Sequence, residues 1–371
     1  MKFLIVTLAP TLQKNNMYYS YAPYVYEMNL WAKNVTELGI VSPVSYDKEL
    51  LLSKFDKQPQ VFPINSFSFI SLKEFFRSLY RLPGILYAIY KAMKWADHIH
   101  LRCPGNIGLL GCLVQILFPN TPKSVKYAGN WDPKSKQPFS YKVQQFLLRN
   151  TWFTKNVKVL VYGDWKENSK NIKPFFTASY SEKEKEIVEA KHFDSCINFV
   201  FVGTLSPGKQ PLISVKVVHE LLKKGINVNL DMYGDGSERE LLEHYILEHQ
   251  LQDFVVLHGN KAKEIIKEAY KRAHFLVFIS KSEGWPKVVA EAMFWKCLPI
   301  STAVSCVPTM LDQGKRGSLV SPDVVTITKE IEYYLNNDKV YADKVLAAFN
   351  WSRTYTLDKF ENEIKKLLIE N

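Results

Sequence analysis

The sequence predicts an α/β protein with two domains, each built around a parallel sheet. A chain of 371 residues, 47% hydrophobic and 23% charged, is long enough to fold as two domains of ordinary size. In both halves, short apolar runs alternate with longer amphipathic stretches. This alternation of strand and helix patterns is typical of doubly wound sheets, and no repeat of solenoid length interrupts it.

In the first half, the predicted elements begin as strand, helix and strand. Residues 3–8 form an apolar run typical of a central parallel strand. A polar, tyrosine-rich loop is expected next, then a helix at 24–33 and a strand at 37–44. Residues 72–95 are basic and amphipathic, and Pro83-Gly84 is expected to divide them into two helices. Later strands are predicted at 98–101, 124–128 and 157–162.

The charged run at residues 181–186 lacks core-forming side chains and is expected to be a linker or a helical bridge. A second α/β series follows it. Its strands are predicted at 198–202, 227–233, 254–257 and 275–279, and its helices at 211–224, 238–250 and 261–272. We therefore place the first domain at 1–185, the second at 186–350, and a terminal segment with an amphipathic helix at 351–371.

Charge is unevenly distributed along the chain. Residues 1–180 carry 23 Lys/Arg and 10 Asp/Glu, whereas residues 181–371 carry 25 and 27, which together give the net charge of +11. A basic half favours an anionic partner such as a membrane surface, a lipid diphosphate or nucleic acid, and a solvated basic surface is the alternative. In residues 72–95 aromatic and basic side chains interleave: Phe75, Phe76, Tyr80 and Tyr90 with Arg77, Arg81, Lys91 and Lys94.

Several classes of protein are not expected. No stretch of eighteen apolar residues predicts a membrane span, and the N-terminal run predicts a buried strand rather than a signal peptide. The five cysteines show neither a CxxC nor a zinc spacing, so we expect reduced thiols, a cytoplasmic protein and no metal site. The basic half contains no recognisable nucleic-acid module, so we expect no nucleic-acid partner.

Two glutamates eight residues apart are the main functional signal. Glu283 and Glu291 flank Gly284-Trp285-Pro286, where a loop turns into a helix. Pro286 suits the first helical position, which leaves Glu283 on the loop and Glu291 inside the helix. The free N–H groups of a helix start suit a phosphate. Two carboxylates on either side of that phosphate site could hold the ends of a nucleotide-sugar, although helix capping or surface charge is the simpler alternative.

The segment E-G-W-P-K-V-V-A-E-A-M strongly resembles the E-x7-E signature of retaining glycosyltransferases of the GT-B fold, in the large family 4 group, also called group 1. Other segments match in the expected order, so the resemblance covers most of the chain. It implies two facing Rossmann-like domains and a last helix that crosses back to pack on the first domain. Parts of the first half also resemble glycosyltransferases of bacterial surface-polysaccharide clusters.

The resemblance assigns roles to residues of the second domain. It implies that Glu283 approaches the donor sugar, that Glu291 binds the ribose, and that Lys209 binds the diphosphate. The other donor-binding residues that it implies are Gly203, Thr204, Tyr233, Gly234, Asn260, Gly284, Trp285, Pro286, Lys287 and Val288. Three positions depart from the family pattern: Thr204 stands where many members have arginine, Cys306 where glycine is common, and Thr309 where an acidic residue is common.

On the acceptor side the sequence departs further from the family. The glycine-rich first loop is replaced by Lys14-Asn15-Asn16, and the histidine that many relatives carry is missing from residues 128–132. The candidate acceptor-side residues are therefore those at two strand ends: Arg102, Asn130, Trp131 and Asp132.

The resemblance implies a metal-independent hexosyltransferase that needs no cofactor beyond its nucleoside diphosphate-sugar donor. We expect it to transfer the sugar, with retention, to a hydroxyl of a lipid-linked glycan at the inner face of the membrane. The alternatives are a non-catalytic or slow GT-B-shaped partner subunit that binds a sugar nucleotide, and a GT-B epimerase that changes the donor without an acceptor. The sequence leaves the sugar, the base, the acceptor and the oligomeric state open.

Overall fold

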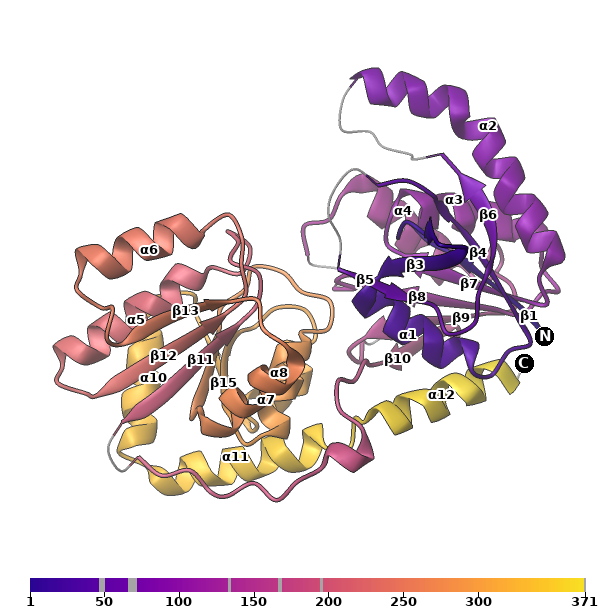
Figure 1. Ribbon diagram of the computed structural model, residues 1–371. Coiled ribbons are helices and arrows are strands. Elements are labelled where there is room, and N and C mark those ends of the chain that lie inside the picture. The colour runs from indigo at the N-terminus through magenta and orange to yellow at the C-terminus, as the bar shows by residue number, and fades with distance from the viewer. Residues whose placement is uncertain (47–50, 66–71, 133–134, 166–168, 194–195, 370–371) are drawn as a thin grey trace. The chain divides into compact units, whose positions relative to one another are not determined.

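The computed structural model describes residues 1–46, 51–65, 72–132, 135–165, 169–193 and 196–369, and the side chains of residues 72–78 lie outside the description. The chain forms two compact units (Figure 1). Unit 1 comprises Met1–Phe175 and Phe360–Asn371, and unit 2 comprises Phe176–Lys359. Each has its own parallel sheet, so the predicted α/β class with two parallel sheets is confirmed.

Unit 1 contains a seven-stranded sheet in the order β10-β9-β8-β7-β1-β4-β6, with all neighbouring pairs parallel. The strands are β1 (Lys2–Val6), β4 (Glu37–Pro43), β6 (Gln60–Ile64), β7 (His98–Cys103), β8 (Lys123–Tyr127), β9 (Val157–Tyr162) and β10 (Ile172–Phe175). Strand β1 lies in the sheet interior, and its residues 3–6 are fully buried. An uninterrupted apolar run gives this result because helices cover both faces of such a sheet.

Helices α2 (Leu72–Trp95), α3 (Asn106–Val114) and α4 (Phe139–Arg149) share one core with alternate residues of the sheet, among them Leu4 and Val6 (Figure 1). On the other face of β1, Phe3 stacks on Trp31 of α1 (Ala22–Ala32) at 5.6 Å between ring centroids. A short helix, η1 (Gln115–Leu117), follows α3.

The prediction that Pro83-Gly84 breaks residues 72–95 into two helices is wrong, because α2 is a single helix with Pro83 inside it. Proline removes one helical hydrogen bond, but the apolar face of α2 continues on both sides of it. Leu82, Ile85 and Ile89 all pack in the unit 1 core. Tertiary packing therefore offsets the local cost.

The expected polar loop after β1 is also wrong in part. Strands β2 (Leu12–Lys14) and β3 (Met17–Tyr21) form an antiparallel hairpin, and β5 (Leu52–Lys54) pairs with β3. Asn15 and Asn16 form the two-residue turn and have φ angles of 47° and 58°. Two consecutive positive φ angles are typical of a type I′ turn, which asparagine tolerates well.

Unit 2 contains a six-stranded parallel sheet in the order β13-β12-β11-β14-β15-β16, with helices on both faces (Figure 1). Its strands are β11 (Ile197–Val202), β12 (Val228–Tyr233), β13 (Val255–Gly259), β14 (Phe275–Phe278), β15 (Leu298–Thr302) and β16 (Ser318–Val320). Its helices are η2 (Glu182–Glu184), α5 (Pro211–Lys223), α6 (Arg239–Glu248), α7 (Lys263–Arg272), α8 (Lys287–Phe294), α9 (Val307–Met310), η3 (Asp312–Gly314), α10 (Val324–Leu335) and α11 (Asp338–Ser352).

The two units divide the chain at positions that differ from the expected domain limits of 185/186 and 350/351. Residues after Phe175 already bond within unit 2, since Thr356 Oγ1 donates to Glu182 Oε1 at 2.8 Å. The charged run 181–186 contains η2, and two of its acidic side chains pair with α7: Glu184 with Lys263 at 2.7 Å, and Glu186 with Lys267 and Lys271.

The last helix is α12 (Leu357–Ile369), and from Phe360 onward it belongs to unit 1. Phe360, Ile364 and Leu368 are buried along one side of it. Phe360 packs on Phe175 with 5.5 Å between ring centroids. In the described part of the chain, no helix is both long enough and apolar enough to cross a membrane.

Candidate functional site

Three loops lie side by side at the carboxyl edge of the unit 2 sheet, where open α/β sheets bind their ligands. Backbone hydrogen bonds extend from the strands into these loops. Gly203 N donates to Tyr233 O at 2.9 Å, and Gly234 N donates to Gly259 O at 2.9 Å. Leu205 N donates to the next loop at Asp235 O, at 3.0 Å. The segments after β11, β12 and β13 are therefore locked together by their main chains.

Glycine is required where these loops touch. Gly234 has a φ angle of +133°, and a Cβ atom placed on it would lie 1.9 Å from the carbonyl oxygen of Gly203. A Cβ atom on Gly236 would lie 2.4 Å from the carbonyl oxygen of Leu205. Only residues without a side chain permit this approach. The predicted site residues Gly203 and Gly234 are thus in direct backbone contact.

Lys209 and Glu283, which are far apart in sequence, meet at this edge. Lys209 follows the loop after β11, and its Nζ forms an ion pair with Glu283 Oε1. The same Nζ lies 4.8 Å from the ring centroid of Phe278, the last residue of β14. Ser280 Oγ donates to Glu283 Oε1 at 2.5 Å. The Glu283 side chain is 10% exposed and that of Lys209 26% exposed, so the ion pair is mostly buried and Lys209 is its more accessible member.

The loop that carries Glu283 leads into α8. Pro286 is the N-cap of α8 rather than its first helical residue, so the expected helix start is wrong by one position. Lys287 and Val288 then occupy the first turn, whose N–H groups have no acceptor within the helix. The missing N–H of proline would be equally harmless at either position, which explains why the pattern did not separate them.

Cys306 and Ser305 hold this loop from the side. Cys306 Sγ and Ser305 Oγ lie 3.1 Å and 3.0 Å from the carbonyl oxygen of Gly284, and both donate to it. Burial raises the pKa of the Cys306 thiol to about 12, so it keeps its proton and remains a donor. Trp285, the next residue, packs against Tyr355 at 5.9 Å between ring centroids. Cys306 therefore supports the loop in which Gly284 lies.

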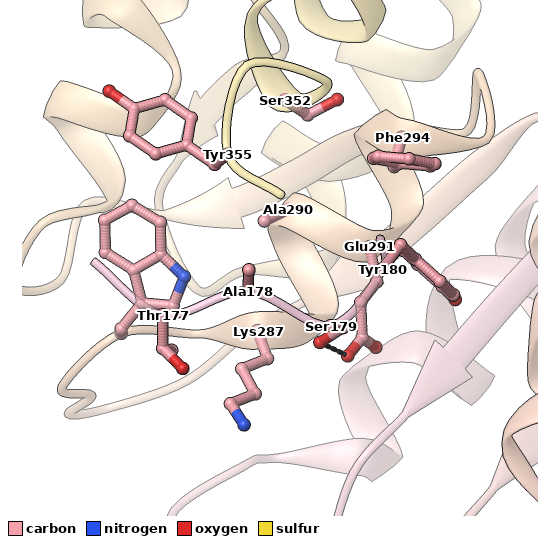
Figure 2. Close-up of a pocket in the computed structure, with 11 residues that line it drawn as sticks. Thr177, Ala178, Ser179, Tyr180, Lys287, Ala290, Glu291, Phe294, Ser352 and Tyr355 are labelled. Atoms are coloured by element: carbon pink, nitrogen blue, oxygen red, sulfur yellow. Dashed lines mark hydrogen bonds between the residues drawn. The ribbon is translucent and has the colours of Figure 1, made fainter. Parts of the chain in front are cut away.

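Glu291 lies apart from this pair. Figure 2 shows it on α8, lining a narrow cavity together with Lys287 and residues 177–180. Neither Lys209 nor Glu283 lines that cavity, which has room for about one water molecule. Ser179 Oγ donates to Glu291 Oε1 at 2.5 Å, and Tyr270 OH donates to Oε2 at 3.3 Å. The structure thus brings Lys209 and Glu283 together and places Glu291 in a separate setting.

The segments predicted to form the base pocket lie at the ends of β12 and β13. Tyr233 is buried and its ring stacks on His258, with 4.5 Å between centroids and an interplanar angle of 8°. His258 Nε2 lies 2.6 Å from Asp231 Oδ1. Asn260 is exposed just beyond β13. Tyr233 therefore packs beneath the predicted base pocket as a buried ring, while Asn260 is open to solvent.

The acceptor-side candidates lie in unit 1, and they divide into two groups. Arg102 on β7 forms an ion pair with Glu27 of α1 at 2.5 Å, and Lys126 on β8 reaches the same Glu27 oxygen at 2.9 Å. Trp131 is fully buried beside Tyr127. The neighbouring residues Asn130 and Asp132 form a local turn, since the Asp132 N–H donates to Asn130 Oδ1 at 2.9 Å.

Sequence reasoning missed three residues that contact candidate site residues in unit 2, Ser179, Tyr270 and Ser280, and one that contacts Arg102 in unit 1, Glu27. Ser280 lies three residues before Glu283 and could have been considered from its spacing. The other three are distant in sequence from the residues that they contact, and no local pattern identifies them. Among the described residues, no group of three or more His, Cys, Asp or Glu side chains is arranged to hold a metal ion.

Comparison with known proteins identifies this architecture. Residues 182–350 match the family model described as glycosyl transferases group 1. A curated relative from Campylobacter jejuni is 24% identical over 205 residues, which are 52% of this chain and 56% of that protein. Its name is GalNAc-alpha-(1->4)-GalNAc-alpha-(1->3)-diNAcBac-PP-undecaprenol alpha-1,4-N-acetyl-D-galactosaminyltransferase. The chain thus spans little more than half the length of this curated relative.

Several solved structures resemble the whole chain, and two of them illustrate the likeness. Anabaena HepE in complex with UDP and glucose has a TM-score of 0.70 at 14% identity and covers 100% of both chains. Sucrose-phosphate synthase from Thermosynechococcus elongatus has a TM-score of 0.69 at 14% identity, over 100% of this chain and 98% of the other. At this identity the likeness shows the fold alone. The expected GT-B fold is therefore confirmed, and residues 182–350 of the chain form a domain of the group 1 glycosyltransferases.

Proposed function

We propose that this chain is a retaining glycosyltransferase of family 4 that transfers a sugar from a nucleoside diphosphate-sugar to a hydroxyl group of a lipid-linked glycan, in the synthesis of a surface polysaccharide. The observation that carries the proposal is the Lys209–Glu283 ion pair at the carboxyl edge of the unit 2 sheet. It lies in the segment that matches the group 1 model. The named activity of the Campylobacter relative, which acts on an undecaprenol-linked glycan, supports the acceptor class.

The reaction needs positioned charges more than a reactive side chain. As the acceptor oxygen bonds to the sugar carbon, the bond from that carbon to the diphosphate breaks, and the leaving phosphate oxygen takes the acceptor proton. Negative charge develops on the diphosphate as its bond to the sugar carbon breaks, before the proton arrives. The Lys209 ammonium and the first N–H groups of α8 stabilise that charge, and Glu283 orients the sugar through its hydroxyl groups.

The present partners of Lys209 and Glu283 fit these roles. The two side chains neutralise each other, and Ser280 adds a hydrogen bond to the carboxylate. A diphosphate offers Lys209 a more highly charged partner, and a sugar hydroxyl offers Glu283 a donor. Donor binding therefore exchanges one ion pair for two ligand contacts, without leaving a buried charge alone.

We include the inner face of the membrane in the proposal because unit 1 is basic and exposes large apolar side chains. Tyr80 and Tyr87 on α2 are 89% and 67% exposed, and Phe139 and Phe146 on α4 are 82% and 60% exposed. Trp152, just after α4, is 71% exposed. Helix α3 packs against both α2 and α4. The side chains of Phe75, Phe76 and Arg77, which were part of the sequence-based expectation, lie outside the described residues.

Vesicle co-sedimentation tests membrane binding. Exposed aromatic groups insert at the interface, while each basic residue near an anionic surface contributes about 1 kcal/mol that salt screens. Binding should therefore rise with the phosphatidylglycerol fraction and fall with salt. Serine at Arg81, Lys91 and Lys94 should weaken it, whereas serine at the exposed unit 2 residues Val325 and Tyr333 should not. Equal binding to neutral and anionic vesicles, or to neither, would indicate a soluble acceptor.

A thermal-shift panel with UDP, GDP, ADP and dTDP tests donor binding. A ligand at 100 times its Kd stabilises the fold by about 2.7 kcal/mol, which is several degrees for a domain of this size. The matching nucleotide-sugar should then release its nucleoside diphosphate slowly in water and faster with an acceptor extract. If none of the four nucleotides raises the melting temperature, the proposed donor site is wrong.

The alternative of a non-catalytic partner subunit has one observation in its favour. Thr204 is exposed on the loop after β11 and supplies a hydroxyl group where a charged side chain would bind the leaving phosphates more strongly. Such a subunit would bind a nucleotide in the thermal-shift panel but would not turn over its sugar derivative. An epimerase would instead change the sugar nucleotide without any acceptor.

A further inference from the structure

The Glu291 carboxylate is held by two hydroxyl groups that come from different parts of unit 2. Ser179 lies in the segment just before η2 and donates to Oε1 at 2.5 Å, as Figure 2 shows. Tyr270 lies in α7, is fully buried, and donates to Oε2 at 3.3 Å. Glu291 itself lies on α8. Three elements that are separate in sequence therefore meet at one carboxylate.

One donor on each oxygen restricts how the carboxylate can rotate. Its terminal torsion is broad when it is free, so hydrogen bonds to both oxygens select one orientation of the plane. A carboxylate has about four acceptor positions, and the two hydroxyl groups use only two of them. The remaining positions stay available to a ligand that carries two neighbouring O–H groups.

The donor roles of the two hydroxyl groups are well defined. Burial, together with the nearby Glu291 charge, raises the pKa of Tyr270 well above its usual value, so this hydroxyl keeps its proton and donates the hydrogen bond.

The cavity beside Ser179 has room for about one water molecule and is too small for a sugar ring. A ribose that binds Glu291 must therefore use the acceptor positions that Ser179 and Tyr270 leave open.

We propose that Ser179 and Tyr270 are positioning residues, which hold Glu291 in the orientation that accepts hydrogen bonds from the ribose diol of the donor nucleotide. The inference rests on the proposed function, in which Glu291 binds ribose. Pre-oriented acceptors bind more tightly because the ligand does not have to order them. If instead the hydroxyl groups only satisfy a half-buried carboxylate, their loss would change stability and leave nucleotide affinity unchanged.

Isothermal titration with a nucleoside diphosphate separates these roles. The probe is the one among the ribonucleotides UDP, GDP and ADP that stabilises the wild type most, because dTDP has no ribose diol. Ser179→Ala and Tyr270→Phe should each raise its Kd about tenfold, the scale of one hydrogen bond to a charged group. Ser179→Thr keeps the hydroxyl and should restore most of the affinity. In a Glu291→Ala background, neither change should have any further effect, since nothing remains to be positioned.

Two other residues of the same cavity supply matched controls. Ser352 Oγ donates to Phe349 O at 3.2 Å, and Tyr355 packs on Trp285. In the described structure neither is hydrogen-bonded to Glu291, although both line the cavity (Figure 2). Ser352→Ala and Tyr355→Phe remove the same chemical groups and should keep the Kd within about twofold of wild type. The melting temperature of each variant shows whether it is folded.

The outcomes distinguish failure of this inference from failure of the proposed function. If Glu291→Ala leaves the Kd unchanged, the ribose role of Glu291 is wrong. If Glu291→Ala weakens binding but Ser179→Ala and Tyr270→Phe bind as the wild type does, the positioning role is overturned. Tighter binding by Ser179→Ala would also overturn it, because Ser179 would then compete with the ribose for the carboxylate.

Discussion

Lys209→Ala tests the central charge of the proposed donor site. In the wild type, Lys209 Nζ contacts Glu283 Oε1, and the lysine side chain is 26% exposed. We expect the change to lower kcat/KM strongly, because the leaving diphosphate then loses the cation that we propose for it. A unit charge about 4 Å away contributes roughly 4 kcal/mol at the effective dielectric of a protein surface, and partial exposure reduces this.

The expected loss of transition-state stabilisation is therefore about 2–4 kcal/mol, the scale of one pre-organised electrostatic contact. This corresponds to a fall in kcat/KM of roughly 30- to 1000-fold. Lys209→Arg retains the charge and should recover part of it. The folded state should survive, since Ser280 Oγ still donates to the Glu283 carboxylate at 2.5 Å. Thr204→Arg on the neighbouring loop would add a cation and should tighten donor binding.

The assay is release of nucleoside diphosphate from the nucleotide-sugar that binds best in the thermal-shift panel, measured with and without acceptor extract. Lys223→Ala is the matched control, because Lys223 also pairs with a glutamate, Glu220, at 2.9 Å, but on the exposed side of α5. It should keep wild-type kinetics. If Lys209→Ala stays within about threefold of wild type, the diphosphate charge is neutralised elsewhere and the proposed role of Lys209 is wrong.

Three further predictions follow from the same structure. Glu291→Ala should weaken nucleoside diphosphate binding in titration calorimetry, whereas Glu283→Ala should lower turnover without weakening that affinity; the reverse pattern would exchange their roles. Gly234→Ala should lower the free energy of unfolding by about 3 kcal/mol or more in urea melts, because its Cβ would lie 1.9 Å from Gly203 O. Gly225 also has a positive φ but has open space around it, so Gly225→Ala should lower the free energy of unfolding by about 1 kcal/mol. Burial lowers the pKa of His98 from 6.5 to about 3, so between these pH values the unfolded chain binds a proton that the folded chain does not. The free energy of unfolding should therefore fall by up to about 4 kcal/mol as the pH drops from 6.5 towards 3. His98→Asn should reduce that loss, whereas His244→Asn, at an exposed position, should not.

The parallel strands were the most predictable part of the fold. Residues 157–162 were predicted as a strand, and β9 has the same bounds. Strands covered on both faces need unbroken apolar runs, which are easy to recognise. The hairpin of β2 and β3 was missed because it is short and carries polar and tyrosine residues without a clear alternation. Asn15-Asn16 was the available signal, since two asparagines suit the positive φ angles of a tight turn.

The sequence predicted which residues form the loop cluster, but it did not predict which of them contact one another. Glycines after three strands indicate a ligand edge, yet only the structure shows that Gly234 must be glycine because the backbone of Gly203 fills its side-chain space. Likewise, the motif identified Lys209 and Glu283, but their ion pair joins residues that are 74 positions apart. Contacts of this kind depend on how β11 and β14 pair in the sheet, and local periodicity contains no information on that pairing.

The two signature glutamates differ in a way that follows from their partners. Glu283 is paired with a cation, so its charge is already neutralised. We expect Lys209 to leave Glu283 only when another anion binds the lysine. Glu291 is held by two neutral hydroxyl groups, which orient the carboxylate without neutralising it. A neutral diol can therefore bind at Glu291 without displacing an ion pair, whereas contact at Glu283 is coupled to capture of the diphosphate by Lys209. In the proposed function, the same residue type, eight positions apart on one loop and helix, therefore has a binding role in one place and a charge-coupled role in the other.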